Sequence, residues 1–177
     1  MSETETPVKT LYQGEFLTLL RNRHWEYVAR VRSRGAVFVV ALTEARELVL
    51  VEQYRIPIRA HSIELPAGIV GDEAEFADEG IGAAAIRELE EETGYRGESA
   101  ELLVTGPNAA GMTSEILNLV RVRGLKRVSE GGGVGDEDIT VHRVPVAEVE
   151  SWLARQQAAG KAIDPRIYMA LWFAQRP

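Results

Sequence analysis

The pattern of apolar residues along the chain predicts a series of short strands. Ala36–Leu42 and Glu47–Tyr54 are strand-length runs separated by a turn-like segment. Within them, Val37–Val40 and Leu48–Val51 are apolar on both parities, which is typical of strands buried on both faces. Further strands are expected at Phe16–Leu20, Trp25–Val31, Ala100–Thr105, Ile116–Val122 and Ile139–Val144.

Three segments have the pattern of helices. They are roughly Glu79–Thr93, then Ala147–Ala159, and a last segment that starts at Asp164 and Pro165, an N-cap residue followed by proline at N1. Gly94 stands where a C-cap glycine is favoured. Strands mixed with helices on either side indicate a layered α/β fold.

The length of 177 residues fits one domain with a small appendage. Residues 1–8 are expected to form a loose tail, and residues 1–33 as a whole form the tail and a small β extension. Residues 34–177 then form the main domain. Added β elements are a common place for dimer contacts, so we expect a homodimer.

Composition and charge narrow the class of protein. The absence of cysteine excludes disulfides, thiolate catalysis and zinc–sulfur sites. The formal net charge of −7 argues against a nucleic-acid partner but not against a phosphorylated ligand, because a bound cation can invert the local field. No signal peptide is expected at the start, and the longest apolar run, Ala36–Leu42, is too short to span a bilayer. A cytoplasmic enzyme or binding module without a membrane partner is therefore expected.

Four glutamates crowd into five residues of the first predicted helix, in the stretch AAAIRELEEETGY. Like charges at i,i+4 spacing destabilise a helix by about 0.2–0.5 kcal/mol per pair. At about 100° per residue, Glu91 and Glu92 lie within about 60° of Glu88, whereas Glu90 lies about 200° away and should point to solvent. An apolar stripe beside them is expected to fix the helix against a sheet; it consists of Ala85, Ile86 and Leu89.

Three convergent carboxylates suit a hard cation. Magnesium usually takes one or two carboxylates and completes its shell with waters and substrate phosphates. Arg87 can hold one of the carboxylates through a bidentate contact. Taken alone, the cluster is more typical of a solvated acidic face, because short motifs often match by chance.

Residues upstream of the helix extend the pattern. Gly68, Glu79 and the run Arg87-Glu88-Leu89-X-Glu91-Glu92-X-Gly94-Tyr95 resemble the Nudix box, G-x5-E-x7-R-E-U-x-E-E-x-G-U with U apolar. Ten residues separate Gly68 from Glu79 where the family pattern has five, and the acidic insertion is expected to loop out ahead of the helix. The resemblance implies the Nudix α/β/α sandwich with a mixed central sheet.

Nudix hydrolases cleave a nucleoside diphosphate linked to another moiety and use divalent cations. The resemblance implies that Glu88 and Glu92 are the principal metal ligands and that Glu91 makes a further metal or water contact. It also implies that the carbonyl of Ala67 is a backbone ligand of the metal and that Arg87 is one of the catalytic residues. Magnesium is the expected cofactor, with manganese as a possible substitute.

Two further stretches resemble the ADP-ribose and nucleotide-sugar pyrophosphatase branch. Glu52-Gln-Tyr-Arg-Ile56 precedes Ile63-Glu-Leu-Pro-Ala-Gly68 as the E-Q-x-R-I element does there. Arg55 is then expected to bind the diphosphate, because a guanidinium fork fits phosphate oxygens. The alternative is a solvated arginine at a strand end. Glu64 is also expected to contact substrate. Gly106–Glu115 resembles the S-P-G-x-T-S-E loop, and Glu115 either faces the terminal sugar or a metal, or merely opens the next strand.

Gly131–Ile139 resembles the G-G-G-V-x-D-E-D-I loop of GDP-mannose pyrophosphatases. Its glycines are expected to form a mobile loop that closes over substrate, with a plain flexible connection as the alternative. Related sequences often carry a further glutamate at the position of Gly135. The general base is therefore open among Asp136, Glu137 and a metal-organised water; we favour Glu137, which is also a candidate metal ligand.

Trp25 and Tyr27 share a strand parity, so either can stack on the nucleobase, including across a dimer, or simply pack in a core or interface. The sequence thus predicts a metal-dependent pyrophosphatase that acts on ADP-ribose or a nucleoside diphosphate sugar such as GDP-mannose. The alternatives are a Nudix hydrolase of another nucleotide, such as a modified triphosphate or a dinucleotide, and a non-catalytic domain that senses nucleotide sugars.

Overall fold

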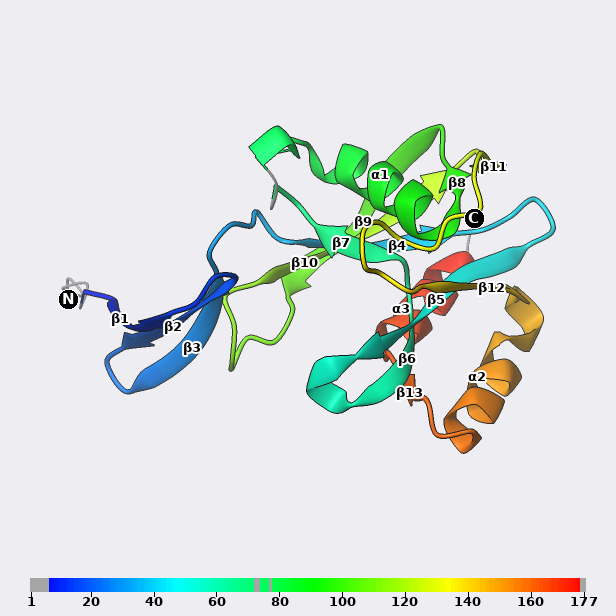
Figure 1. Cartoon of the computed structure of the whole chain (residues 1–177). Coiled ribbons are helices and arrows are strands. Elements are labelled where there is room, and N and C mark those ends of the chain that lie inside the picture. Colours follow the sequence, from blue (N-terminus) through cyan, green and yellow to red (C-terminus); the bar gives the residue numbers. More distant parts are fainter. Residues whose placement is uncertain (1–6, 72–73, 77, 176–177) are drawn as a thin grey trace.

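The computed structural model describes residues 7–71, 74–76 and 78–175. An N-terminal sheet projects to one side of the body (Figure 1) and consists of β1 (Lys9–Gln13), β2 (Leu17–Asn22) and β3 (Trp25–Arg30). The central sheet of the body contains, in spatial order, β7 (Ala67–Ile69), β4 (Ala36–Ala41), β10 (Ile116–Arg123) and β9 (Ser99–Pro107). The second sheet contains β12 (Thr140–Pro145), β5 (Glu47–Arg55), β6 (Ala60–Glu64) and β13 (Ala162–Ile163).

Helices cover the body on both sides. Helix α1 (Ile81–Thr93) lies at one side, and α2 (Val149–Ala158) and α3 (Arg166–Ala174) lie at the other (Figure 1). A small sheet next to α1 pairs β8 (Tyr95–Arg96) with β11 (Lys126–Arg127). Short 3-10 turns occur at Ile56–Ile58, Ala74–Phe76 and Val146–Glu148.

Strand β4 explains why the fold has three layers. It pairs in parallel with β10 and antiparallel with β7, and all six of its residues are buried. Val37 and Val39 pack with the apolar face of α1, whereas Phe38 and Val40 pack with residues of α2 and α3. A strand buried on both faces needs a layer on each side, and the helices supply them.

The structure confirms the predicted α/β class and the predicted α/β/α sandwich with mixed sheets. The three predicted helices correspond to α1, α2 and α3. Helix α3 begins at Arg166, after Pro165, but the carboxylate of Asp164 still accepts the backbone N–H of Arg166 at 2.8 Å. The N-cap residue is therefore Pro165, one position later than the sequence predicts, and Asp164 contributes a side-chain hydrogen bond to the first turn.

Some strands were not predicted. The sequence reading missed β1, β6 and β7 and the two-residue strands, because short segments with polar residues carry no clear two-residue periodicity.

The insertion ahead of α1 contains the 3-10 turn Ala74–Phe76. Residues 72, 73 and 77 of the insertion lie outside the described part of the chain, as do residues 1–6 of the predicted tail. The predicted boundary between residues 33 and 34 and the homodimer remain predictions.

The N-terminal sheet is joined to the body by backbone contacts. The N–H of Val28 donates to the carbonyl of Met112 at 2.9 Å, and the N–H of Ser114 donates to the carbonyl of Val28 at 3.1 Å. The extension is thus attached to the loop before β10. No helix in the described part of the chain is long and apolar enough to cross a membrane.

Candidate active site

A cavity of about 460 Å³ lies where the central sheet, α1, α3 and the N-terminal extension meet. Seven of the predicted site residues line it: Arg55, Glu64, Ala67, Glu88, Glu92, Glu115 and Glu137. Four further polar residues that the sequence reading did not select also line it: Arg30, Gln53, Asn108 and Arg166. The cavity therefore combines several carboxylates with three guanidinium groups.

Helix α1 presents its glutamates to different surroundings, as its periodicity predicts. Ala84, Ala85 and Leu89 are fully buried and fix the helix against the sheet. On the opposite flank Glu90 forms an ion pair with Arg96, so it faces away from the cavity as expected but is paired rather than solvated. The glutamates of α1 are thus not an equivalent, solvated face.

Glu88 lies directly on the backbone of β7. A Cβ atom added to Gly68 would lie 1.8 Å from the carboxylate carbon of Glu88. The carboxylate therefore occupies the space that any other residue at position 68 would fill. This close approach explains why the box has glycine at position 68, because only glycine leaves room for the carboxylate next to the β7 backbone.

Glu92 is the most buried carboxylate of the cavity, with 4% of its surface exposed. The backbone N–H of Ala67 donates to its Oε2 at 3.0 Å, and among the described residues no Lys, Arg or His forms an ion pair with it. Burial raises the pKa of Glu92 to about 8, helped by the negative charges of Glu88 and Glu137 and opposed by the Ala67 hydrogen bond. A buried carboxylate beside two others is a place where a cation is favourable.

The donor set fits a divalent cation that is shared with substrate. The oxygens of Glu88, Glu92 and the Ala67 backbone are hard ligands of the kind that magnesium prefers. Within the described ranges no three Asp, Glu or His side chains converge closely enough to hold a metal by themselves. Magnesium usually takes only one or two carboxylates and leaves the other positions to water and phosphate oxygens, so the residues present fit that mode.

Arg87 and Glu91 do not line the cavity. They line a groove on another side of α1, together with Ala83, Ile86, Glu90 and Arg96. The Arg87 guanidinium lies 3.0 Å from Glu91 and 3.0 Å from Glu88, and 3.1 Å from Glu79. Arg87 thus forms ion pairs with these three carboxylates from the side of α1 that faces away from the cavity. The metal or water contact of Glu91 stays a prediction.

Arg55 and Glu64 form a bidentate pair inside the cavity. Arg55 donates from Nε to Glu64 Oε1 at 2.9 Å and from Nη2 to Oε2 at 2.6 Å. Burial alone would raise the pKa of the Glu64 carboxyl, but the contact with Arg55 outweighs burial and lowers it. Arg55 is therefore not a solvated strand-end arginine, and its predicted contact with the diphosphate stays a prediction.

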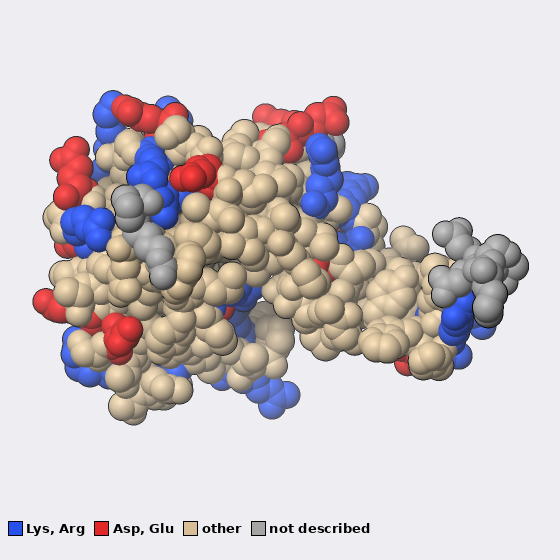
Figure 2. Space-filling model, turned by 180° about the vertical axis from the view of Figure 1, so that it is seen from behind, with Lys and Arg blue, Asp and Glu red and all other residues tan. Residues whose placement is uncertain are grey.

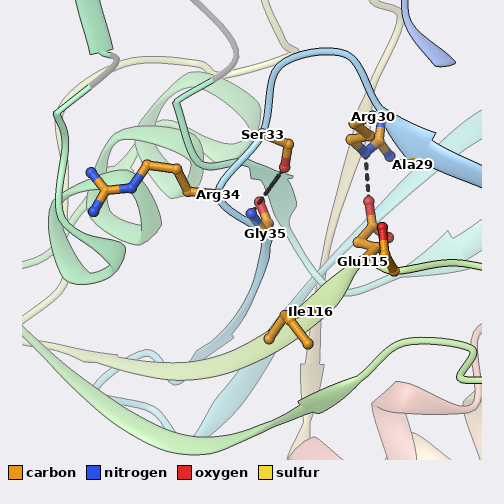
Figure 3. Close-up of a pocket in the computed structure, with 8 residues that line it drawn as sticks. Ala29, Arg30, Ser33, Arg34, Gly35, Glu115 and Ile116 are labelled. Carbon is orange, nitrogen blue, oxygen red and sulfur yellow. Dashed lines mark hydrogen bonds and ion pairs between the residues drawn. The ribbon is translucent and has the colours of Figure 1, made fainter. Parts of the chain in front are cut away.

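Glu115 both precedes strand β10 and lines the cavity. Figure 3 shows its carboxylate facing Arg30 at the end of β3, with which it forms an ion pair, while Arg34 points away. The side-chain amide of Asn108 donates to its other oxygen at 2.6 Å. Arg30 and Glu115 also border a smaller cavity of about 240 Å³ next to the main one. The extension thus contributes one charged residue, Arg30, to the rim of the site.

Arg166 is the best-anchored cation that the sequence reading missed. Its guanidinium donates to both oxygens of Asp164 at 2.8 Å, donates to Asn108 Oδ1 at 3.3 Å, and stacks over the Phe38 ring at 3.9 Å. In the sequence, the only feature that could have indicated this residue is its position two residues after Asp164. Trp25 and Tyr27 lie outside the cavity lining, on β3, so base stacking by them stays a prediction.

The protonation of Glu92 gives a testable pH dependence. Its ordinary pKa is 4.5 and the folded value is about 8, so between these values the folded state holds a proton that the unfolded state has lost. The resulting stability is complete below about pH 4.5 and is lost as pH rises through about 8. We expect the Tm of chelator-treated protein to fall between about pH 5 and 8 and to level off above that range. In Glu92→Gln the Tm should not show this fall with pH, whereas in Glu90→Gln it should. The same dependence of Tm on pH in both variants would contradict the assignment of the raised pKa to Glu92.

Comparison with known proteins assigns the family. The model of the NUDIX domain matches residues 32–171. This chain belongs to the Nudix family. Nudix hydrolases generally use divalent metal ions, in agreement with the oxygen ligands of the cavity. A solved structure, described as that of an ADP compounds hydrolase, superposes on this Nudix chain with a TM-score of 0.70 over 96% of this chain and 90% of the other. At 22% identity, that likeness shows the fold.

Three relatives of this Nudix protein share part of its sequence. The methanol dehydrogenase activator of Bacillus methanolicus is 40% identical over 61% of this chain and 55% of its own length. The ADP-ribose pyrophosphatase of Bacillus subtilis is 32% identical over 56% of this chain and 51% of its own length. The GDP-mannose pyrophosphatase of Cronobacter sakazakii is 30% identical over 66% of this chain and 62% of its own length. The Nudix chain thus spans little more than half the length of these relatives.

Proposed function

We propose that this Nudix protein hydrolyses the diphosphate of ADP-ribose or of a nucleoside diphosphate sugar such as GDP-mannose. The products are a nucleoside monophosphate and a sugar phosphate. The observation that carries the proposal is the pairing, in one cavity, of the buried Glu92 and the partly buried Glu88 carboxylates with three anchored guanidinium groups. The names of the B. subtilis and C. sakazakii relatives support the same substrate class.

Magnesium is the cation that we assign to the site, with manganese as a substitute. Glu88, Glu92 and the carbonyl of Ala67 would hold it. When bound there, such a cation neutralises charge on the diphosphate and lowers the pKa of a water. The carboxylates of this chain contribute negative charge and leave open positions for phosphate oxygens and water.

The guanidinium groups are suited to hold the diphosphate in place. Arg55, Arg30 and Arg166 are each fixed by a carboxylate, and the planar fork of arginine still presents free N–H groups. A donor that is already fixed loses little side-chain entropy when substrate binds. The arginines therefore bind and orient the phosphates, and Glu137 accepts the proton of the attacking water, which requires its carboxylate to be ionised.

A substrate panel tests the proposal. Purified protein with magnesium is incubated with ADP-ribose, GDP-mannose, UDP-glucose or 8-oxo-dGTP, and monophosphate release is measured by chromatography. We expect release from ADP-ribose or a nucleoside diphosphate sugar and little from the triphosphate. Release from 8-oxo-dGTP alone would contradict the proposed substrate class, and no release from any of the four would favour a binding role.

We also propose a homodimer formed through the N-terminal sheet, and a cytoplasmic location. The extension exposes large apolar side chains, and Figure 2 shows it as an arm that projects from the body. The exposed fractions are 68% for Tyr12, 71% for Phe16 and 51% for Trp25. Large apolar side chains that are exposed in this way are typical of association surfaces. Light scattering that gave the 19.6 kDa mass of one chain would contradict the dimer.

A further inference from the structure

The loop that carries Glu137 is joined through its backbone to the C-terminal end of α1. The N–H of Gly132 donates to the carbonyl of Glu92 at 2.9 Å, and the N–H of Gly133 donates to the carbonyl of Glu91 at 3.0 Å. The last carbonyls of a helix have no partner inside the helix, and these N–H groups supply one. The loop is therefore fastened to the same helix turn that carries Glu92.

Glycine is required where the loop touches the helix. The φ angles of Gly131, Gly132 and Gly133 are 69°, 108° and 90°, a region that favours glycine. A Cβ atom on Gly131 would lie 2.4 Å from the carbonyl carbon of Thr93. A Cβ atom on Gly133 would lie 2.6 Å from both Cβ and Oε2 of Glu137. Any side chain at these two positions must displace either the end of α1 or Glu137 itself.

The second half of the loop closes on Glu137. The N–H of Val134 donates to Oε2 of Glu137 at 3.0 Å, and the N–H of Glu137 donates to the carbonyl of Val134 at 3.2 Å. The N–H of Ile139 returns to the carbonyl of Gly132 at 3.2 Å. The Glu137 carboxylate is thus held at the cavity by a turn that is anchored on α1.

We propose that residues 131–133 form a glycine clamp, a positioning device that sets Glu137 against Glu88 and Glu92. The clamp rests on the proposed function, in which Glu137 accepts the proton of the attacking water. Gly133 is then a positioning residue that acts on the reaction through Glu137. Orientation of a proton acceptor matters because a displacement of about 1 Å can cost about a hundredfold in rate.

Gly133→Ala tests the clamp, with Gly135→Ala as the matched control. Gly135 also has a left-handed φ, 63°, but a Cβ atom there meets nothing within 4 Å. We expect Gly133→Ala to lower kcat by roughly ten- to a hundredfold with KM within about threefold, and Gly135→Ala to change either by less than about threefold. In a Glu137→Gln background, Gly133→Ala should add less than about threefold, because the group it positions is already disabled. An equal loss in both backgrounds would overturn the proposal.

Amide hydrogen exchange provides a readout that does not depend on activity. In the wild type and in Gly135→Ala, the amides of Gly132 and Gly133 should be protected to the same degree as the last turn of α1, and Gly131→Ala should remove that protection. Exchange of these amides at unprotected rates in the wild type would overturn the clamp even if the protein hydrolyses every substrate of the panel. Protected amides in a wild type without hydrolase activity would instead refute the proposed function, and with it the catalytic role of the clamp.

Discussion

Replacing Glu92 or Glu88 by glutamine is expected to lower kcat/KM by roughly two orders of magnitude or more, about 2.7 kcal/mol of transition-state stabilisation. The substitution keeps size and helix propensity but removes a charge from the cavity. Glu92 is 4% exposed and Glu88 lies against the backbone of Gly68, so neither charge can be replaced by a neighbouring side chain that moves in. Steady-state kinetics with ADP-ribose measure the effect.

Glu90→Gln is the matched control within the same helix. Its carboxylate pairs with Arg96 on the flank away from the cavity, so kcat/KM should change by less than about threefold. Circular dichroism checks that all three variants fold. Equal and small effects at positions 88, 90 and 92 would mean that the acidic stretch is only a charged surface, and the account of the cavity would be wrong.

Removal of divalent cations is expected to abolish hydrolysis, and magnesium or manganese should restore it. The physical reason is the electrostatics of the cavity, where Glu88, Glu92 and Glu137 would repel the negative diphosphate unless a cation lies between them. The chain has no cysteine that could supply another nucleophile. The measurement is the rate after exhaustive chelation and after each metal is added back; a full rate after chelation would contradict the proposed mechanism.

The same assay should show a rise in activity toward mildly alkaline pH. Ionisation of Glu92, with a pKa of about 8, exposes the negative charge that a cation binds, so cation affinity increases as pH rises through that value. The Glu137 carboxylate must also be ionised to accept a proton. The apparent metal affinity, measured at several pH values, separates this contribution from the chemical step.

The sequence was sufficient to predict α1 because helical periodicity is a local property, and the resemblance to the Nudix box then selected Glu88 and Glu92 as the expected metal ligands. Periodicity also placed Glu91 on the face of Glu88 and Glu92, although the structure turns Glu91 toward Arg87 and away from the cavity. A helix face about 100° wide contacts more than one environment, and only the neighbouring strands decide which part of the face borders the cavity. That information is not contained in the spacing of the glutamates.

The rest of the site depends on contacts between distant segments. Arg166 reaches the cavity because it lies on Phe38 and is bound by Asn108, 58 residues away along the chain. The pairing of Arg30 with Glu115 likewise depends on how the N-terminal sheet joins the loop before β10. The glycines of the clamp were predicted to make the loop mobile, and its closure over substrate stays a prediction. The structure adds that these glycines bring the backbone close to α1, a contact that depends on tertiary packing and is not visible in the local sequence.

The most direct test of the central claim is to identify the products of one substrate by ³¹P NMR. ADP-ribose is incubated with magnesium and wild-type protein, and in parallel with Glu92→Gln. The account predicts that the diphosphate resonances are replaced by those of AMP and ribose phosphate with the wild type and persist with Glu92→Gln. Unchanged diphosphate resonances with the wild type, or equal conversion by Glu92→Gln, would contradict it.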